Sequence, residues 1–360
     1  MNTKNNTNNK KIKAVDFFCG GGGMSYGMKC AGINILAGID YEKNCKETYE
    51  ANIGANKFIQ ADVFDLKEKV LQEQLNLKKN DDDLLLIGCS PCQFWSIINT
   101  NKTKSTRSKN LLIEFHRFVK YFNPGYVVVE NVPGVLRKKE ESGLGNFINW
   151  LETSGYTVHF KIHNTNDYGV PQSRKRFTLV ANRINNNKIF PEKDKGEKLV
   201  VKDVIGVTNG FPKIKAGTID KTDFLHSVPN ISNLTLRRIK KVKTDGGNRL
   251  GFANNQELQL KCFIGKDSFF KDTFGRLWWN KPSPTITTKF FSVSNGRFVH
   301  PEENRALSLR EGACLQSFPK DYKFFGTSHC AIARLIGNAV PPEYAKRIGQ
   351  AIIKNHLDAI

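Results

Sequence analysis

The stretch Ala14-Val15-Asp16-Phe17-Phe18-Cys19-Gly20-Gly21-Gly22-Gly23-Met24 decides the fold class of this chain. Residues 14–19 are mostly apolar and predict a short strand. Four consecutive glycines follow, and residues 24–30 then have the pattern of a helix. A strand, a glycine turn and a helix in this order predict the opening of a βαβ unit.

The same alternation continues as far as residue 181. Strands are predicted at 33–39, 58–61, 84–87, 126–129, 157–162 and 176–181, and helices at 43–52, 66–77, 110–121 and 145–154. Alternation of this kind predicts an α/β fold with a doubly wound sheet.

The character of the sequence changes near Asn185. Residues 188–310 alternate less and contain more Gly, Asn, Pro and Lys, with aromatic pairs such as Phe269-Phe270. Helical periodicity returns at 309–316 and again at 342–354. We therefore predict a disordered tail at 1–13, a large domain made of 14–187 plus 311–360, and a smaller domain at 188–310.

The charge of the chain favours a polyanionic partner. Its 55 Lys and Arg outnumber 34 Asp and Glu, which gives a formal net charge of +21. Clustered cations bind a phosphate backbone because they release its condensed counterions. A general bias toward lysine and asparagine would give the same excess, so charge alone leaves both interpretations open.

The eight cysteines are scattered, which indicates a reducing compartment and not a secreted disulfide framework. Cys89 and Cys92 form a C-x-x-C pair, but no second pair or Cys/His cluster completes a metal site, so we expect no metal. The chain opens without a basic and apolar leader, and no run of about 18 apolar residues could span a bilayer. We expect a cytoplasmic protein without a membrane partner.

Two acidic residues strengthen the case for a ligand at the glycine turn. Asp40 ends the second predicted strand, where a carboxylate can accept hydrogen bonds from a ribose, and Asp62 follows the third. Capping of the next helix is the alternative, most of all for Asp62. Because Ser25 stands where a dinucleotide fingerprint has its third glycine, a nucleoside-containing cofactor other than NAD fits better.

Cys92 is a candidate nucleophile. It lies in Gly88-Cys89-Ser90-Pro91-Cys92-Gln93, directly after the predicted strand 84–87, so the thiol lies on a strand-to-loop turn braced by a proline. On this motif alone a buried packing cysteine is an equal alternative, and redox chemistry with Cys89 is another.

The chain resembles the C5-cytosine-specific DNA methyltransferases of the bacterial restriction-modification type. The motifs that carry the resemblance occur in the family's order and cover nearly the whole chain: Asp16-Phe17-Phe18-Cys19-Gly20-Gly21-Gly22-Gly23, Ser90-Pro91-Cys92-Gln93, Glu130-Asn131-Val132, Gln172-Ser173-Arg174-Lys175-Arg176, Arg305-Ala306-Leu307-Ser308-Leu309-Arg310-Glu311 and Gly337-Asn338-Ala339-Val340. The resemblance implies a Rossmann-like, S-adenosylmethionine-dependent methyltransferase fold with a small target-recognition domain inserted before the last motifs.

The resemblance also implies the cofactor site. Phe18 would stack on the adenine, Asp40 would bind the ribose hydroxyls, and Asp62 with Val63 would meet the adenine edge. The glycine backbone would hold the methionine end of S-adenosylmethionine. The full set of expected cofactor residues is Phe18, Gly20, Gly22, Gly23, Asp40, Tyr41, Asp62, Val63, Pro91, Asn338 and Val340.

The resemblance also implies four residues that take part in the methylation of cytosine. Cys92 would add as a thiolate to C6 of cytosine, which activates C5 for methylation. Glu130 would hold a proton against N3, and a carboxyl group keeps a proton at neutral pH only when it is desolvated or near another anion. Arg176 would bind the base oxygen O2, with Arg174 nearer the DNA backbone. The base that removes the C5 proton is not identified.

The expected partner is double-stranded DNA, with the target cytosine flipped out of the helix. Residues 94–109 are polar and basic and would close over the DNA. Candidate DNA contacts are Gln93, Ser96, Arg107, Arg237, Arg238 and Arg249. The resemblance implies a monomer and allows a restriction endonuclease of the same specificity as a functional partner, but it gives no recognition sequence.

Three rival functions stay open. The tRNA-methylating branch of the family shares every catalytic motif, although Cys262-Phe263-Ile264 lacks the threonine of that branch's signature. A DNA-binding regulator without turnover would not need a thiol, a carboxyl and an arginine together. A redox protein would depend on Cys89.

The chain departs from the pattern of the family at two places. Asp40 is one methylene shorter than the glutamate often found there, and Ser and Lys replace an acid expected before residue 110.

Overall fold

The computed structural model describes residues 11–90 and 110–359, and within them a seven-stranded sheet forms the centre of the molecule. Its strand order is β3-β2-β1-β4-β5-β7-β6. The strands are β1 (Lys13–Phe17), β2 (Asn34–Asp40), β3 (Phe58–Gln60), β4 (Leu84–Gly88), β5 (Tyr126–Asn131), β6 (Thr157–Asn164) and β7 (Lys175–Asn182). The chain moves outward from β1 in one direction and from β4 in the other, so the switch point lies between these two strands.

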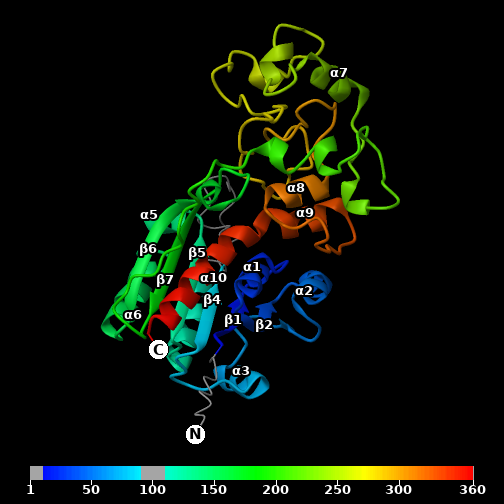
Figure 1. The fold of residues 1–360 in the computed structure, drawn as a ribbon. Helices are drawn as coiled ribbons and strands as arrows, with labels where there is room; N and C mark the ends of the chain where they lie inside the picture. Colours follow the sequence, from blue (N-terminus) through cyan, green and yellow to red (C-terminus); the bar gives the residue numbers. More distant parts are fainter. Residues whose placement is uncertain (1–10, 91–109, 360) are drawn as a thin grey trace.

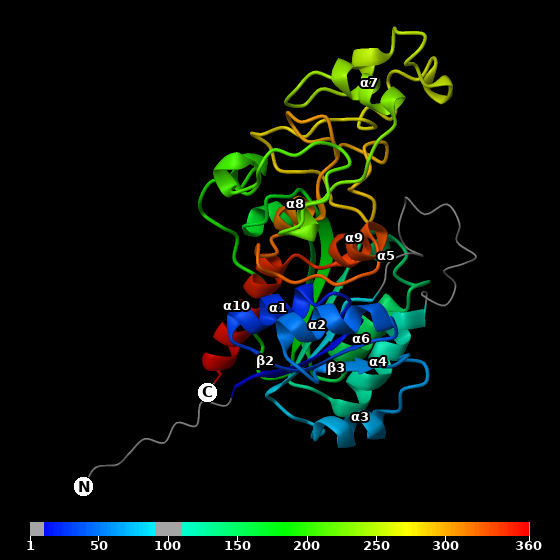
Figure 2. The ribbon, with the colours of Figure 1, turned by 90° about the vertical axis from the view of Figure 1, so that its right-hand side faces the viewer.

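Helices cover both faces of the sheet, which confirms the doubly wound fold. In Figure 1, α1 and α10 lie together over one face, and Figure 2 shows α3, α4 and α6 on the opposite side. The α-helices are α1 (Gly23–Ala31), α2 (Lys46–Ile53), α3 (Glu68–Leu75), α4 (Leu111–Phe122), α5 (Gly134–Arg137), α6 (Leu144–Thr153), α7 (Asn233–Lys241), α8 (Leu309–Leu315), α9 (His329–Asn338) and α10 (Pro342–Leu357).

The central strands are continuously apolar because both of their faces are buried. In β4, Leu84 and Leu86 join the hydrophobic core that contains α4 and α6. Leu85 and Ile87 join the other core, which contains α1 and α10. All four side chains are fully buried, so one strand stabilises both layers.

Strands β1 to β5 pair in parallel, whereas β7 is antiparallel to both β5 and β6. The reason lies in the connections. A helix crosses over between successive parallel strands, but only a short loop with the 3-10 turn Thr165–Tyr168 joins β6 to β7. A connection of this length returns the chain in the opposite direction.

Every strand and helix predicted from the sequence is present, with ends shifted by a few residues. The predicted helix at 43–52 begins as the 3-10 turn Lys43–Cys45 before α2. Helices α5, α7 and α9 were not predicted from the sequence. For α9 the signal was present, because Ser328 caps the helix by accepting a hydrogen bond from the Ala331 N–H, and Ile332, Leu335 and Ile336 follow at helical spacing.

The segment 188–310 rises from the carboxyl edge of the sheet and consists mostly of loops and short turns (Figures 1 and 2). One part of it, including Val201, Ile205 and Leu277, packs into the core shared with α8 and α10. A separate small core is formed by Ile239, Val242, Phe252, Leu258, Phe274, Val293, Val299 and Ala306. The exact domain boundaries stay a prediction.

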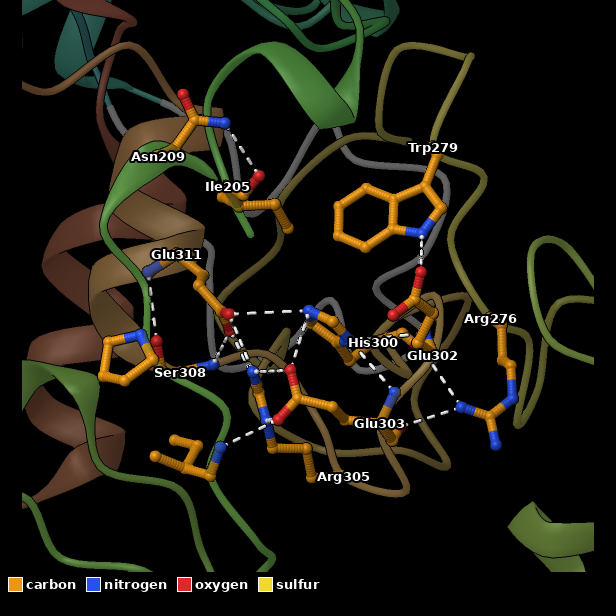
Figure 3. Close-up of polar contacts among 12 residues, drawn as sticks. Ile205, Asn209, Arg276, Trp279, His300, Glu302, Glu303, Arg305, Ser308 and Glu311 are labelled. Atoms are coloured by element: carbon orange, nitrogen blue, oxygen red, sulfur yellow. Dashed lines mark hydrogen bonds and ion pairs between the residues drawn. The ribbon is translucent and has the colours of Figure 1, made fainter. Parts of the chain in front are cut away.

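A buried charged network joins the end of this segment to α8 (Figure 3). Arg305 donates to both carboxylate oxygens of Glu311, at 2.7 and 2.8 Å, and Arg305 Nη2 lies 3.0 Å from Glu303 Oε1. Glu311 also accepts the Ser308 N–H and so completes the N-terminal cap of α8. Burial raises the pKa of Glu311, but the charge and hydrogen bonds of Arg305, the charge of His300 and the Ser308 N–H together lower it to about 2.

Candidate active site

The candidate site lies at the carboxyl edge of the sheet, where the chain leaves β1 through the glycine turn. Phe18 and Gly20 adopt left-handed backbone conformations, with φ of 63° and 50°. The turn is held by Cys19 N–H donating to Ile39 O at 3.1 Å and Gly22 N–H donating to Cys19 O at 2.9 Å. A Cβ built on Gly20 would meet no atom of the described residues within 4 Å, so these residues leave space beside the backbone of the turn.

The last motif of the chain packs directly against the start of α1. A Cβ on Gly23 would lie 2.3 Å from Val340 O and 3.2 Å from Ala339 Cβ, so only glycine fits there. Val340 is buried, whereas Asn338 is exposed at the end of α9. Residues about 320 apart in sequence, Gly23 and Val340, thus line the same edge of the sheet.

Asp40 fixes the geometry of the glycine turn. Its Oδ2 accepts the Gly20 N–H at 2.9 Å, and its Oδ1 accepts the Glu42 N–H at 2.9 Å. Burial raises the pKa of Asp40, although both hydrogen bonds favour the ionised form. Each oxygen keeps a second lone pair for a ligand hydroxyl. Tyr41, the next residue, is 65% exposed and lies at the rim.

Asp62 and Val63 follow the neighbouring strand β3. Asp62 Oδ1 accepts the Phe64 N–H at 3.1 Å, and Val63 is buried in the core beneath. The Val63 carbonyl accepts a hydrogen bond from Arg117 Nη2 at 2.8 Å, which ties this loop to α4. Asp40 and Asp62 therefore lie at the ends of adjacent strands on the same edge, as expected from the sequence.

Asp16 is a further candidate site residue that was not predicted from the sequence. It lies on β1 directly below the glycine turn and is fully buried. Ser25 Oγ donates to Asp16 Oδ2 at 2.6 Å and also contacts Tyr49 OH at 2.8 Å, whereas Asp16 Oδ1 has no hydrogen-bond partner among the described residues. Burial raises its pKa to about 7. A lone acid inside the apolar run Val15-Asp16-Phe17 was the available signal.

Glu130 and Arg176 meet at the carboxyl end of β5. Arg176 Nε lies 3.1 Å from Glu130 Oε1, and both side chains are largely buried. Burial raises the pKa of Glu130, while the charges of Arg176 and Arg174 act in the opposite direction. The result is a desolvated carboxyl group that gains a proton more readily than an exposed glutamate.

Asn131 ties β5 to the end of β4. Its Nδ2 donates to Ser90 O at 3.3 Å and to Ser90 Oγ at 3.2 Å, and its Oδ1 accepts the Val132 N–H at 2.8 Å. Ser90 is the last residue that the structure describes before residues 91–109. Five expected site residues lie outside the described residues: Pro91, Cys92, Gln93, Ser96 and Arg107.

Arg174 binds main-chain carbonyls from two segments that are distant in sequence. It precedes β7, is 3% exposed, and donates to three main-chain carbonyls, those of Ile286, Gly337 and Ala339, at 3.1 to 3.2 Å. These contacts hold the last motif against the edge of the sheet. Arg174 thus fixes the framework beside Glu130, and its approach to the DNA backbone stays a prediction.

The three arginines expected to contact DNA from the segment 188–310 differ in exposure. Arg237 is exposed on α7 and forms an ion pair with Glu257, and Arg238 Nε donates to Leu258 O at 2.7 Å. Arg249 is only 2% exposed, and main-chain carbonyls within 266–270 occupy its guanidinium. Arg249 therefore holds the backbone of this loop, and its contact with DNA stays a prediction.

A large cavity among the described residues, of about 900 Å³, lies elsewhere, between 193–199, α8 and α10. Its charges pair with each other, since Lys193 and Lys198 bind Asp167 and Arg347 binds Asp194. The unsatisfied Asp16 carboxyl group and the open backbone at Gly20 therefore favour the sheet edge as the ligand site.

No helix in the described part of the chain is long and apolar enough to cross a membrane.

The strand order, with the candidate site at the switch point, places the protein among the doubly wound α/β proteins. The model of the C-5 cytosine-specific DNA methylase family matches residues 12–354. The chain belongs to this family.

Individual relatives agree with this assignment. The chain is 35% identical to the type II methylase M.HgiDII of Herpetosiphon aurantiacus, over 96% of each protein. It is 33% identical to the type II methyltransferase M1.HphI of Haemophilus parahaemolyticus, over 94% of this chain and 86% of that protein. The fold is similar to the S. pombe Dnmt2 methyltransferase, with a TM-score of 0.59, 18% identity, and coverage of 97% of this chain and 100% of that structure.

Proposed function

We propose that this protein transfers a methyl group from S-adenosylmethionine to C5 of a flipped-out cytosine within a short specific sequence of double-stranded DNA. The observation that carries the proposal is the buried pair of Glu130 and Arg176 at the carboxyl edge. Asn131 ties this pair to Ser90, which leads directly into Pro91-Cys92-Gln93.

The residues at the glycine turn fit S-adenosylmethionine. Gly20 leaves open space beside the backbone, and Asp40 offers carboxylate lone pairs to ribose hydroxyls. Asp16 Oδ1, which no described residue satisfies, suits a positively charged or polar group of the cofactor. When bound, the cofactor supplies an electrophilic methyl group on its sulfonium.

The residues at the other side of the edge suit activation of cytosine. The Cys92 thiolate adds to C6, which places electron density on C5 so that C5 can take the methyl group. Glu130 holds a proton at N3 and so withdraws charge from the ring, and its raised pKa favours the protonated state. Arg176 donates to O2. Loss of the C5 proton then allows the C6–S bond to break and releases Cys92.

The partner is double-stranded DNA, since cytosine inside a duplex is out of reach of these groups until it is flipped out. The net charge of +21 supports binding to the phosphate backbone. Because the relatives are named type II methylases, we further propose that a restriction endonuclease of the same specificity is its functional partner. We expect the enzyme to act as a monomer in the cytoplasm.

Bisulfite sequencing of DNA from methylation-free cells that express the protein tests this proposal. The wild type should protect cytosines within one short sequence motif, and Cys92→Ala should protect none. Cys89→Ser is the matched control, because it removes the neighbouring thiol and should keep activity. Protection by Cys92→Ala, or no protected DNA cytosine with folded wild-type protein that binds S-adenosylmethionine, would overturn the proposal and make RNA the next substrate to test.

A further inference from the structure

Two adjacent phenylalanines project into solvent from the segment 188–310. Phe269 is 65% exposed and Phe270 is 66% exposed, and Ile264, five residues before Phe269, is 57% exposed. We call residues 261–272 the aromatic tip. Large aromatic side chains are normally buried in the core or at an interface, so two neighbouring exposed rings indicate a binding surface.

The aromatic tip is held in place from below by Arg249. Its Nη2 donates to Lys266 O at 2.5 Å and to Phe269 O at 2.7 Å, and its Nε donates to Phe270 O at 3.2 Å. The guanidinium also lies 4.6 Å from the centre of the Phe263 ring. One buried cation therefore binds the backbone of both exposed phenylalanines and presents their rings outward.

The backbone of the aromatic tip carries strain at Phe270. Its φ of +51° lies in the left-handed region, which a bulky side chain rarely adopts. The ring of Phe270 lies 5.9 Å from that of Phe263, so the two aromatic residues support each other. Strained residues persist where the surrounding contacts over-determine them, which is typical of ligand-binding segments.

The charge around the rings fits a polyanion. Lys261, Lys266 and Lys271 are exposed and form no ion pair with any described residue. The two acids of the aromatic tip are already neutralised, since Asp267 lies 3.5 Å from Arg249 and Asp272 lies 2.8 Å from Arg297. Two rings flanked by three unpaired lysines are suited to bases bordered by phosphates.

We propose that the aromatic tip binds the DNA duplex, with Phe269 and Phe270 in contact with bases and the three lysines on the adjacent phosphates. This inference rests on the proposed function, because it names a surface that the DNA substrate of that reaction would contact. Apolar side chains that insert at a base step, or pack on a thymine methyl group, discriminate sequences without hydrogen bonds. The aromatic tip would then contribute to target selection.

The experiment compares wild type with Phe269→Ala/Phe270→Ala in binding to a labelled mixed-sequence duplex and in steady-state methylation of unmethylated DNA. The matched control is Phe190→Ala, which removes a phenylalanine that is 53% exposed outside the aromatic tip. A third variant, Lys261→Gln/Lys266→Gln/Lys271→Gln, tests the phosphate contacts through the salt dependence of binding. Melting temperatures establish that each variant is folded.

We expect Phe269→Ala/Phe270→Ala to weaken DNA binding and raise KM for DNA roughly 5- to 100-fold, the range for loss of one aromatic–base contact. Its kcat and its salt slope should be nearly unchanged. The lysine variant should reduce the salt slope by about one to three, since each phosphate contact contributes about 0.9. Phe190→Ala should behave as wild type.

The inference would be overturned if the folded Phe269→Ala/Phe270→Ala variant kept the DNA affinity and the KM of the wild type. An equal loss of DNA affinity in Phe190→Ala would overturn it as well. A wild-type protein that sediments as a dimer, with Phe269→Ala/Phe270→Ala monomeric and unchanged in KM, would assign the aromatic tip to self-association instead. Failure of the wild type to methylate any DNA would count against the proposed function, whereas the binding comparison would still report on the aromatic tip.

Discussion

Glu130 and Asp16 show how burial changes the chemistry of a carboxyl group. Both lie on central strands of the sheet, and burial raises the pKa of both. They differ in their partners, because Glu130 lies beside Arg176 whereas Asp16 accepts a hydrogen bond from Ser25. Glu130 therefore lies at the expected site of the cytosine base, and Asp16 lies below the glycine turn. A separate prediction follows for each residue.

Glu130→Gln should lower kcat by about 10²-fold or more, in the range of general acid–base catalysis, with little change in DNA affinity. The amide can still donate toward N3 but cannot exchange a proton with the ring. Because the protonated acid is the active form, wild-type activity should fall as pH rises through the raised pKa of Glu130, and the variant should lose this limb. Single-turnover rates measured against pH check this, with the exposed Glu152→Gln as control; an unchanged kcat would remove Glu130 from the reaction.

Asp16→Asn should change how stability depends on pH. Burial raises the Asp16 pKa from 3.8 to about 7, so between these values the folded protein holds a proton that the unfolded chain has lost. This group therefore makes folding less favourable as pH rises from about 4 to about 7. The melting temperature of Asp16→Asn minus that of the wild type should increase over this interval and stay constant above it.

Thermal denaturation of the cofactor-free proteins at several pH values measures this difference. The exposed acid in Asp65→Asn is the control and should give a difference that does not change with pH. A flat difference for Asp16→Asn would mean that Asp16 is ionised in the folded protein throughout the range.

The sequence predicted some of these residues for physical reasons and missed others. Asp40 and Glu130 stand at the ends of apolar strands, where parallel topology gathers side chains at one edge. Asp16 lies inside a strand, where a lone acid in an apolar run was the only sequence signal, and the contacts with Ser25 and Tyr49 depend on the tertiary fold. The burial of Arg174 and Arg249 could not be predicted from the sequence either. Their partners are main-chain carbonyls that are distant in sequence and are brought close only by the fold.

At the scale of elements, the fold depends on the close contact between α1 and the segment before α10. Gly23→Ala would place a methyl group 2.3 Å from Val340 O, and neither backbone can move away without shifting a helix. Overpacking of this kind costs about 1 to 3 kcal/mol, which for a chain of 360 residues lowers the melting temperature by roughly 1 to 4 °C. We also expect a weaker affinity for S-adenosylmethionine, because the same contact lines the proposed cofactor site.

Calorimetry and cofactor titration of Gly23→Ala check both effects. The matched control is Gly196→Ala, since a Cβ at that position meets nothing within 4 Å. A wild-type melting temperature for Gly23→Ala would mean that the two segments separate easily and that their contact does not shape the site.

Helices and strands were predicted well where the spacing of their apolar residues is regular, and poorly where it is not. Strands buried on both faces are continuously apolar and were predicted with small errors in their ends. The short α7 has a mostly polar sequence and buries only Ile239 among its residues, so its pattern was weak. In 188–310 the loops are ordered by long-range contacts, such as those of Arg276 with the carbonyls of Ile239, Val242 and His300, which no local pattern predicts.

At the scale of the whole molecule, the excess of 21 positive charges left two interpretations open, a DNA-binding surface or a general compositional bias. The two differ in how DNA binding responds to salt. If lysines and arginines contact phosphates, the logarithm of the binding constant falls linearly with the logarithm of salt concentration, by about 0.9 for each phosphate neutralised. A diffuse bias without aligned cations would give a shallow slope.

We expect a steep slope, with affinity for a duplex falling at least about tenfold between about 50 and 200 mM salt, as for several phosphate contacts. Fluorescence anisotropy with a labelled duplex measures the slope, and an uncharged-backbone duplex of the same sequence is the control because it has no counterions to release. The kcat at saturating DNA should be nearly independent of salt, since Glu130 and Arg176 are buried together and screened little. A shallow slope with intact methylation would mean that base contacts, the aromatic tip among them, supply most of the affinity, and that the charge excess is compositional.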